Sequence, residues 1–285
     1  MRLGATIDDY LSTCDPDALV AECRKKGYRA AAMPLATLDQ PAIVRDIASA
    51  FDQSDILLAE MAAWVNPLHH KPEQRGQNIA SIKKILTLAD EVGATCCPTV
   101  VGSYCETDQW DSHVGHHPDN FSERAFDEVV DWVREVLDQV RPTRTKLTLE
   151  ICPWTLLDGP QIYLDLIAAI DRPGLGVHLD PANLVTDPRT YYETGRMIDH
   201  CFDLLGSRIL SCHAKDVHWA LDARTMGIEE VVPGCGNLDY ATFLRRAARL
   251  GPDLPLILEH LETESNFEEA AAYIERVGAA VGVSL

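Results

Sequence analysis

The sequence predicts an α/β protein, a single (β/α)8 barrel of the TIM-barrel type over residues 1–285. Short apolar runs of strand length alternate with helix-length segments along the whole chain, which is the rhythm of parallel β/α units. Four of these runs, at 146–150, 175–180, 209–213 and 255–259, end in a residue type that binds metals. In such a barrel the carboxyl ends of the strands meet on one face, where active sites lie.

The first half of the chain predicts four β/α units. Gly27 and Gly93 close two of the expected helices, and Ile79, Ile82 and Ile85 mark the buried face of the third helix by their helical spacing. The expected strands are 2–7, 28–34, 55–64 and 95–101, and the expected helices are 15–26, 40–52, 76–92 and 122–140.

The second half predicts four more units. Helices are expected after the four ligand-ending runs, at 160–170, 188–205, 238–250 and 267–281. The total of eight strands and eight helices is that of a complete barrel. Because no linker or low-complexity tract interrupts the pattern, one domain accounts for the chain.

The least regular part is the segment 102–122, which follows the fourth expected strand. A structureless loop of this length inside a compact domain is usually functional or mobile. We therefore interpret it as a lid or specificity loop above the site. Its histidines, His113, His116 and His117, are expected to be mainly solvated loop side chains.

Composition narrows the class of partner. With 25 basic and 44 acidic residues, the chain has a formal net charge of −19, which argues against nucleic acid and against an anionic membrane surface. No run near the length of a membrane span and no signal peptide is found, and the nine cysteines are scattered. These features predict a reduced, cytoplasmic protein that acts on a small molecule.

Glu150, Asp180, His213 and Glu259 predict a metal centre. A single acidic residue at a strand end is more often a solvated or salt-bridged carboxylate, but four ligand types on four successive strands rarely arise by chance. Their hard, oxygen-rich donor set suits one divalent cation, Mn²⁺ first, with Mg²⁺, Co²⁺ or Zn²⁺ as alternatives. Such an ion would act as a Lewis acid and stabilise the enediolate formed when a carboxylate removes a proton next to a carbonyl.

Strand alternation places residues two apart on one face, and this selects two neighbours of the ligands. His178 lies two residues before Asp180, and it either hydrogen-bonds a ligand or fills the barrel. Lys215 lies two residues beyond His213. We favour Lys215 as a substrate-oxygen ligand or electrophile over a rim salt bridge with Asp216.

Three further residues are candidates for contact with the substrate. Trp154 and Trp219 share the faces of the strand-end ligands and either cover the apolar side of a sugar ring or cap the barrel. Asn183 follows Asp180 and either bonds the substrate or caps a helix. The turn at 233–239 contains two glycines, which is a weak signal for a phosphate seat.

These motifs resemble the xylose isomerase-like TIM barrels, specifically the sugar phosphate isomerase/epimerase group that also includes ketose 3-epimerases, inosose dehydratases and endonuclease IV enzymes. The resemblance rests on Leu149-Glu150, His178-Leu-Asp180-Pro-Ala-Asn183, His213-Ala-Lys215-Asp216, Pro233-Gly-x-Gly-x-x-Asp239-Tyr240 and Leu258-Glu259. It implies one bound divalent metal, a sugar or polyol substrate, and Glu150 and Glu259 as the acid/base pair that flanks the substrate. Related barrels often pair, so a homo-oligomer is an open possibility.

The sequence departs from two branches of this group. Ketose 3-epimerases have a Glu six residues after the first ligand and a His three residues after the Asp, where this chain has Leu156 and Asn183. Endonuclease IV enzymes, which bind three metal ions, also have a His three residues after the Asp and a further Asp-x-His beyond the His of the seventh strand. This chain has Asn183 at the first position, and the stretch 220–232 contains no histidine.

The sequence therefore favours a metal-dependent sugar isomerase or epimerase that acts on a keto-sugar or polyol derivative. The alternative is a lyase or dehydratase of a keto-inositol or a 3-keto-glycoside. An endonuclease IV-like hydrolase and a non-catalytic sugar-binding barrel are further alternatives.

Overall fold

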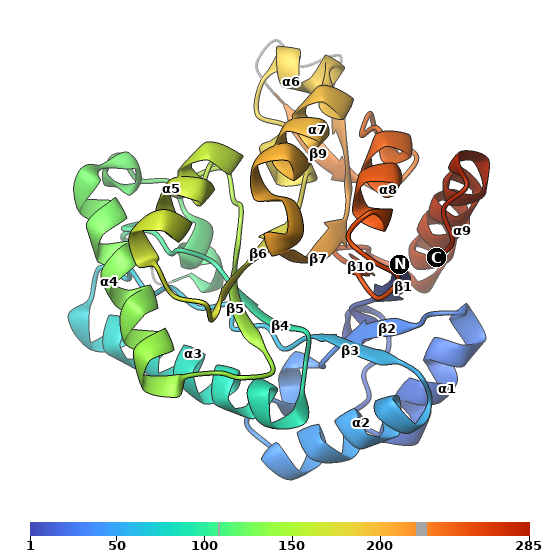
Figure 1. The fold of residues 1–285 in the computed structure, drawn as a ribbon, viewed down its shortest axis with the longest axis horizontal. Helices are drawn as coiled ribbons and strands as arrows, with labels where there is room; N and C mark the ends of the chain where they lie inside the picture. Colours follow the sequence, from blue (N-terminus) through green and yellow to red (C-terminus); the bar gives the residue numbers. More distant parts are fainter. Residues whose placement is uncertain (108, 221–226) are drawn as a thin grey trace. The chain divides into compact units, whose positions relative to one another are not determined.

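Eight parallel strands close into a barrel in the computed structural model, which describes residues 1–107, 109–220 and 227–285. The predicted fold class is confirmed. The order around the barrel is β1-β10-β7-β6-β5-β4-β3-β2, and the strands can be followed by their labels in Figure 1. They are β1 (Arg2–Ala5), β2 (Ala30–Ala32), β3 (Leu57–Glu60), β4 (Cys96–Thr99), β5 (Lys146–Glu150), β6 (Leu175–Leu179), β7 (Ile209–Ala214) and β10 (Pro255–Leu258).

Helices follow the strands, and side-chain caps set several of their starts. The side chains of Asp15, Ser122, Asp239 and Thr263 each accept a backbone N–H of the helix that they precede, which satisfies donors that lack a partner within a helix. The helices are α1 (Pro16–Lys26), α2 (Pro41–Gln53), α3 (Pro72–Val92), α4 (Glu123–Val140), α5 (Pro160–Ile170), α6 (Pro188–Tyr192), α7 (Thr194–Leu205), α8 (Tyr240–Ala248) and α9 (Glu264–Val281). Among the described residues, no helix is both long and apolar enough to cross a membrane.

The helix predicted at 188–205 is two helices in the structure, α6 and α7. The break lies at Glu193, whose backbone is not helical. The next residue, Thr194, is buried, and its hydroxyl donates to Asn237 O at 2.9 Å and accepts from Asp239 N at 3.1 Å. Two hydrogen bonds with the turn at 237–239 therefore hold Thr194 at the break between the helices. This contact joins distant segments of the chain, so helical periodicity does not reveal it.

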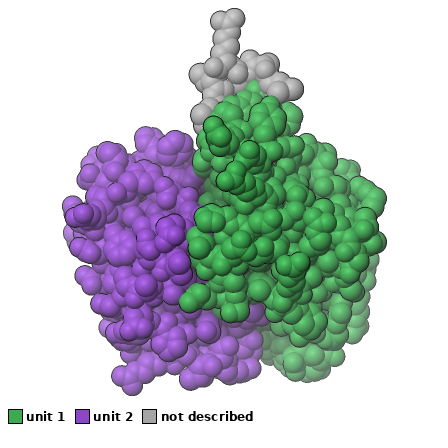
Figure 2. Space-filling view, turned by 45° about the horizontal axis from the view of Figure 1, so that its top comes forward, with its two compact units in different colours: residues 1–59, 179–285 green, residues 60–178 purple. Residues whose placement is uncertain are grey.

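The chain divides into two compact units, which Figure 2 shows in different colours. The first unit consists of residues 1–59 and 179–285, and the second unit consists of residues 60–178. Small residues allow close packing in the first unit: a Cβ on Gly4 would lie 2.1 Å from Ala30 O of the paired strand. That one domain spans 1–285 stays a prediction.

A short antiparallel hairpin in the first unit was not predicted. It consists of β8 (Asp216–Trp219) and β9 (Ile228–Val231), and Asp216 is paired with Val231. Only Lys215 separates β7 from the hairpin, and no glycine or proline marks the place where the barrel strand ends and a different sheet starts.

The predicted lid segment 102–122 is not structureless. It contains the 3₁₀ helices η3 (Trp110–Val114) and η4 (Pro118–Phe121). Buried Asn120 fixes it, because its Nδ2 donates to Ser103 Oγ, Gly115 O and Trp154 O at 3.0, 3.1 and 2.6 Å. A second buried amide, Asn66, accepts from Ser103 N at 2.9 Å. The ordered geometry corrects the expected loop, while a lid function stays a prediction.

Candidate metal centre

Three of the four predicted ligands converge in the first unit. Asp180 directly follows β6, His213 lies in β7, and Glu259 directly follows β10. Because His213 pairs with Ile257, Glu259 lies one alternation step further along the same strand face. His213 Nδ1 lies 2.6 Å from Glu259 Oε1 and 3.9 Å from Asp180 Oδ2. All three are buried, and their ligand atoms lie within 4.8 Å of one another.

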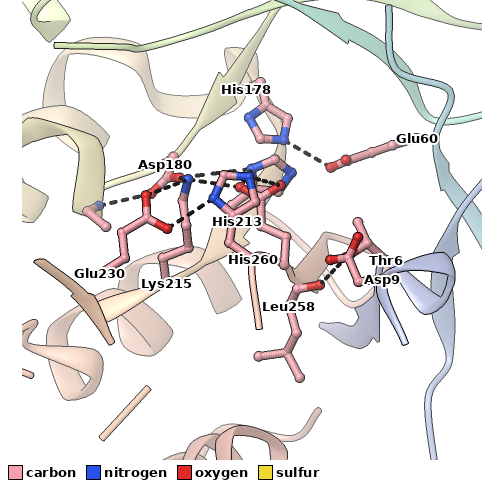
Figure 3. A network of polar contacts seen from close by, with 12 residues as sticks. Thr6, Asp9, Glu60, His178, Asp180, His213, Lys215, Glu230, Leu258 and His260 are labelled. Carbon is pink, nitrogen blue, oxygen red and sulfur yellow. Dashed lines mark hydrogen bonds and ion pairs between the residues drawn. The ribbon is translucent and has the colours of Figure 1, made fainter. Parts of the chain in front are cut away.

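The ammonium group of Lys215 lies among these carboxylates. Its Nζ is 2.8 Å from Asp180 Oδ2 and 2.9 Å from Glu259 Oε1, and the side chain is only 4% exposed. Figure 3 shows Lys215 and His213 directed toward Asp180. Two carboxylates this deeply buried need nearby positive charge, and Lys215 supplies it. The alternative partner considered from the sequence, Asp216, makes different contacts that are described below.

Glu259 is held in its ionised form. Burial works to raise the pKa of this carboxyl group, but the charges of His213 and Lys215 and the hydrogen bond from His213 outweigh it. The pKa of Glu259 therefore lies well below its ordinary value. Ionised, it has the form required both of a metal ligand and of a base that accepts a proton.

Donor chemistry in the first unit fits a hard divalent cation. Two carboxylates and one imidazole are buried and converge, and such donors suit Mn²⁺ and Mg²⁺. A cation at this position would offset the charge that the two carboxylates otherwise direct at Lys215. The residues present are therefore compatible with the predicted metal.

The second unit holds the fourth predicted ligand, Glu150, at the end of β5. Its side chain is buried, and in the sheet its residue pairs with His178 of β6. His178 Nε2 in turn lies 3.0 Å from Glu60 Oε1, and both side chains are almost completely inaccessible to solvent. The structure thus gives His178 a carboxylate partner, which is also visible in Figure 3.

Glu60 is a residue that sequence reasoning missed. It ends β3, after the apolar run Ile56-Leu-Leu-Ala59, and thus shares the signal that identified the four predicted ligands. The prediction extended this strand to residue 64 and so placed Glu60 in its interior. The true strand end would have marked it as a candidate.

The remaining candidates lie in different settings. Asn183 is half-buried in the 3₁₀ helix η5 (Ala182–Leu184), and Trp154, in the second unit, is 60% exposed. Trp219 was expected to share a strand face with His213, and this is wrong: it lies in β8, and its ring centroid is 5.8 Å from that of Tyr191. The chain leaves the barrel after Ala214, which ends the alternation on which that expectation depended.

The glycine turn after β9 is organised around Asp216. This buried carboxylate accepts the backbone N–H groups of Val217, Gly234, Gly236 and Leu238 at 2.9, 2.9, 3.1 and 2.9 Å. Burial raises its pKa even though these four hydrogen bonds act in the opposite direction. A Cβ on Gly236 would lie 2.3 Å from Asp216 Oδ1, so the carboxylate packs directly against the turn and accepts the glycine N–H groups that a phosphate seat would use.

His260 follows Glu259 in a left-handed backbone conformation, with φ of 57°, which is uncommon for residues other than glycine. Its Nδ1 lies 3.0 Å from Glu230 Oε2 of β9, and Lys215 Nζ lies 3.6 Å from Glu230 Oε1. The hairpin therefore adds a further acidic group beside Lys215. Neither His260 nor Glu230 was identified from the sequence.

Residues 20–277 match the family model described as Xylose isomerase-like TIM barrel. No curated protein matches the chain.

Solved structures with a similar fold include proteins of different function. D-psicose 3-epimerase from Clostridium cellulolyticum, solved with D-tagatose, is 14% identical with a TM-score of 0.71, and 99% of each chain is covered. Endonuclease IV from Thermus thermophilus is 19% identical with a TM-score of 0.71, over 99% of this chain and 98% of that chain.

A xylose isomerase-like TIM barrel protein from Mycobacterium smegmatis was solved in complex with magnesium. It is 17% identical with a TM-score of 0.67, over 99% of this chain and 97% of that chain. At these low sequence identities, the similarity to the three structures shows a shared fold and no more.

Proposed function

Because the chain belongs to the xylose isomerase-like TIM barrel family, we propose that it is a divalent-metal-dependent sugar isomerase or epimerase. It acts on a keto-sugar or polyol derivative by removing a proton next to a carbonyl, which gives an enediolate. The observation that carries this proposal is the buried convergence of Asp180, His213 and Glu259 around the ammonium group of Lys215.

The proposed ligand set is Glu150, Asp180, His213 and Glu259, with Mn²⁺ as the first choice of ion. Glu150 is included because it is buried and ends a strand of the same closed barrel, whose carboxyl ends meet on one face. When bound, the ion would polarise the substrate carbonyl and stabilise the negative charge that develops on its oxygen.

The chain's own groups perform the proton transfer. Glu259, which is ionised at neutral pH, accepts the proton from one face of the substrate carbon, and Glu150 serves as its partner on the other face. Lys215 donates to a substrate oxygen. The buried Glu60–His178 contact orients the imidazole of His178, which stays a candidate for contact with the substrate.

Asn183, Trp154 and Trp219 complete the proposed substrate contacts, of which Trp219 is the weakest candidate because it lies outside the barrel sheet. The substrate is a small molecule and not a nucleic acid, consistent with the net charge of −19. All nine cysteines are free, which supports a reducing, cytoplasmic setting. A homo-oligomer remains an open prediction.

A lyase or dehydratase is the second candidate. Two positions favour it: Leu156 is an apolar, buried residue where ketose 3-epimerases have a Glu, and Asn183 replaces their His. An enzyme of this type forms the same enediolate and then expels a β-substituent, so the proposed ligands and bases serve both reactions.

Proton exchange separates the two candidates. We would incubate the Mn²⁺-loaded protein in D₂O with ketoses, keto-inositols and 3-keto-glycosides and follow the products by NMR. An isomerase or epimerase incorporates deuterium into recovered sugar without loss of water or aglycone, whereas a lyase releases one of them. Deuterium incorporation into none of the compounds, with no elimination, would contradict both candidates.

Metal binding has its own test. Glu259→Gln keeps the shape of the side chain but removes its charge, so we expect it to weaken Mn²⁺ binding by about 100-fold or more, as measured by calorimetry and elemental analysis. Glu262→Gln is the matched control because Glu262 is exposed and three residues away. Equal Mn²⁺ affinity in both variants would exclude Glu259 as a ligand.

A further inference from the structure

A cavity of about 330 Å³ opens beside Lys215 and Glu259 in the first unit. This volume is near the lower end of the ~300–1,000 Å³ range of ligand pockets, which suits a ligand of monosaccharide size. Its described walls come from the residue after β7, from β9 with the following turn, from the segment after β10 and from the first turn of α9. The polar side chains of this lining include Lys215, Glu230, Cys235, Glu259, His260 and Glu262.

Negative charge dominates the described lining of this cavity. Glu230, Glu259 and Glu262 contribute three carboxylates, against one ammonium group from Lys215. That ammonium group is already surrounded by carboxylates, two of them below 3 Å. The imidazole of His260 is likewise paired with Glu230 at 3.0 Å. The cationic groups at the wall are therefore engaged within the protein.

The backbone of the glycine turn is engaged as well. Cys235 of this turn lines the cavity, and the neighbouring N–H groups of Gly234 and Gly236 point at the carboxylate of Asp216, at 2.9 and 3.1 Å. Such amide pairs bind phosphate when they face a ligand. Here an internal carboxylate has taken that role.

We propose that this cavity binds the uncharged, hydroxyl-bearing end of the substrate and excludes its phosphate ester. The inference rests on the proposed function and names the substrate class: a free sugar or polyol. With Glu259 assigned to the metal, the described part of the wall still carries the two carboxylates of Glu230 and Glu262 against the one ammonium group of Lys215, so desolvation of a phosphate group there is costly. Hydroxyl groups can donate to the carboxylates of Glu230 and Glu262, so they fit this wall.

Cys235 provides a reporter inside the cavity that does not depend on turnover. It is exposed, whereas Cys14 and Cys105 are half-buried and the other six cysteines are buried. We would measure alkylation of Cys235 by iodoacetamide in the Mn²⁺-loaded protein, using peptide mass spectrometry, with Cys14 and Cys105 as internal references. The probes are D-fructose, D-ribulose, the terminal phosphate ester of each, and inorganic phosphate.

We expect at least one free ketose to slow alkylation of Cys235 by about tenfold when present at ten times its dissociation constant. Its phosphate ester at equal concentration should protect Cys235 less, and inorganic phosphate should not protect it. The proposal is overturned if an ester protects as well as its parent ketose, or if neither ketose protects.

Charge removal provides a second test. Glu230→Gln should improve protection by the phosphate esters relative to the free ketoses by about fivefold, since one nearby charge contributes about 1 kcal/mol. Glu229→Gln is the matched control: it is the adjacent residue of β9, exposed, and absent from the cavity wall. An equal effect of both variants would contradict a role for the cavity.

The two proposals fail in different ways. If a free ketose protects Cys235 but no probe exchanges deuterium or undergoes elimination, the cavity assignment stands and the proposed reaction fails. If a phosphate ester exchanges deuterium faster than its parent ketose and protects Cys235 as strongly as that ketose does, the proposed reaction stands and the cavity assignment fails.

Discussion

At the scale of single residues, Lys215 is the centre of the first unit's polar network. Its Nζ contacts Asp180 at 2.8 Å and Glu259 at 2.9 Å, and all three side chains are buried. A buried charge that loses its partner costs far more than an exposed one, because water cannot replace the missing interaction. Lys215 should therefore contribute most to the free energy of unfolding when no metal ion neutralises the charge of the two carboxylates.

Replacement of this lysine tests that dependence. We expect Lys215→Met to lower the free energy of unfolding by about 3–5 kcal/mol in the presence of EDTA. If Mn²⁺ binds the same carboxylates, saturating Mn²⁺ should restore stability to the variant more than it stabilises the wild type. Urea denaturation followed by circular dichroism, with and without Mn²⁺, measures both effects.

Lys25→Met serves as the control, because Lys25 is an exposed lysine of α1 that pairs with Glu264 and should contribute little. An identical loss of stability in Lys215→Met with EDTA and with Mn²⁺ would show that the ion does not bind these carboxylates.

At the scale of elements, the barrel strands could be located from the sequence because each lies in a short, mostly apolar run between helix-length segments. The runs at 146–150 and 175–180 agree with β5 and β6 to within one residue. The residues at or just beyond their ends, Glu150 and Asp180, were selected by residue type together with this position. Both strands are buried along almost their whole length, as expected for a parallel sheet that is covered on both faces.

What the sequence did not predict depends on contacts between distant segments. β8 and β9 are short and become a hairpin only through mutual pairing, and the break before Thr194 requires the turn at 237–239. The Glu230–His260 pair joins β9 to the residue after Glu259. None of these leaves a periodic signal within a single window of sequence.

The approach to β5 offers a test of how one element is positioned. Asp90, near the end of α3, accepts the backbone N–H groups of Thr143, Arg144 and Thr145 at 2.7, 2.6 and 2.9 Å. These residues immediately precede β5, which carries Glu150 at its other end. Partial burial works to raise the pKa of Asp90, but the three hydrogen bonds outweigh it and hold the pKa below its ordinary value of 3.8.

We expect Asp90→Asn to lower the free energy of unfolding by about 2 kcal/mol at pH 7. Because the folded pKa of Asp90 is depressed, its contribution is present above pH 3.8 and is lost as the pH falls through the lower folded value. The difference between the wild type and the variant should therefore shrink on acidification.

Urea denaturation of both proteins from pH 7 downward measures this difference. Asp131→Asn, at an exposed position of α4, is the control and should show no such pH-dependent gap. A gap for Asp90→Asn that stays constant down to the lowest pH at which the proteins fold would mean that its charge is not involved.

At the scale of the whole molecule, the net charge of −19 adds self-repulsion to the compact state. Any added salt screens this repulsion, whereas a specifically bound divalent ion also binds the buried carboxylates of the folded protein. The two effects can be separated, because screening depends on ionic strength alone, while specific binding depends on the ligands.

Metal removal should therefore lower thermal stability beyond what screening explains. For a single site, Mn²⁺ at about 100 times its dissociation constant adds about 2.7 kcal/mol to the free energy of unfolding, which corresponds to a rise in Tm of about 5 °C for a chain of this size. The comparison is between protein stripped with EDTA and protein reloaded with Mn²⁺, at ionic strength matched with NaCl. Glu259→Gln, which lacks one proposed ligand charge, should lose most of the rise. If NaCl alone or the variant reproduces the full rise in Tm, the stabilisation comes from screening of the surface charge and the proposed metal centre is wrong.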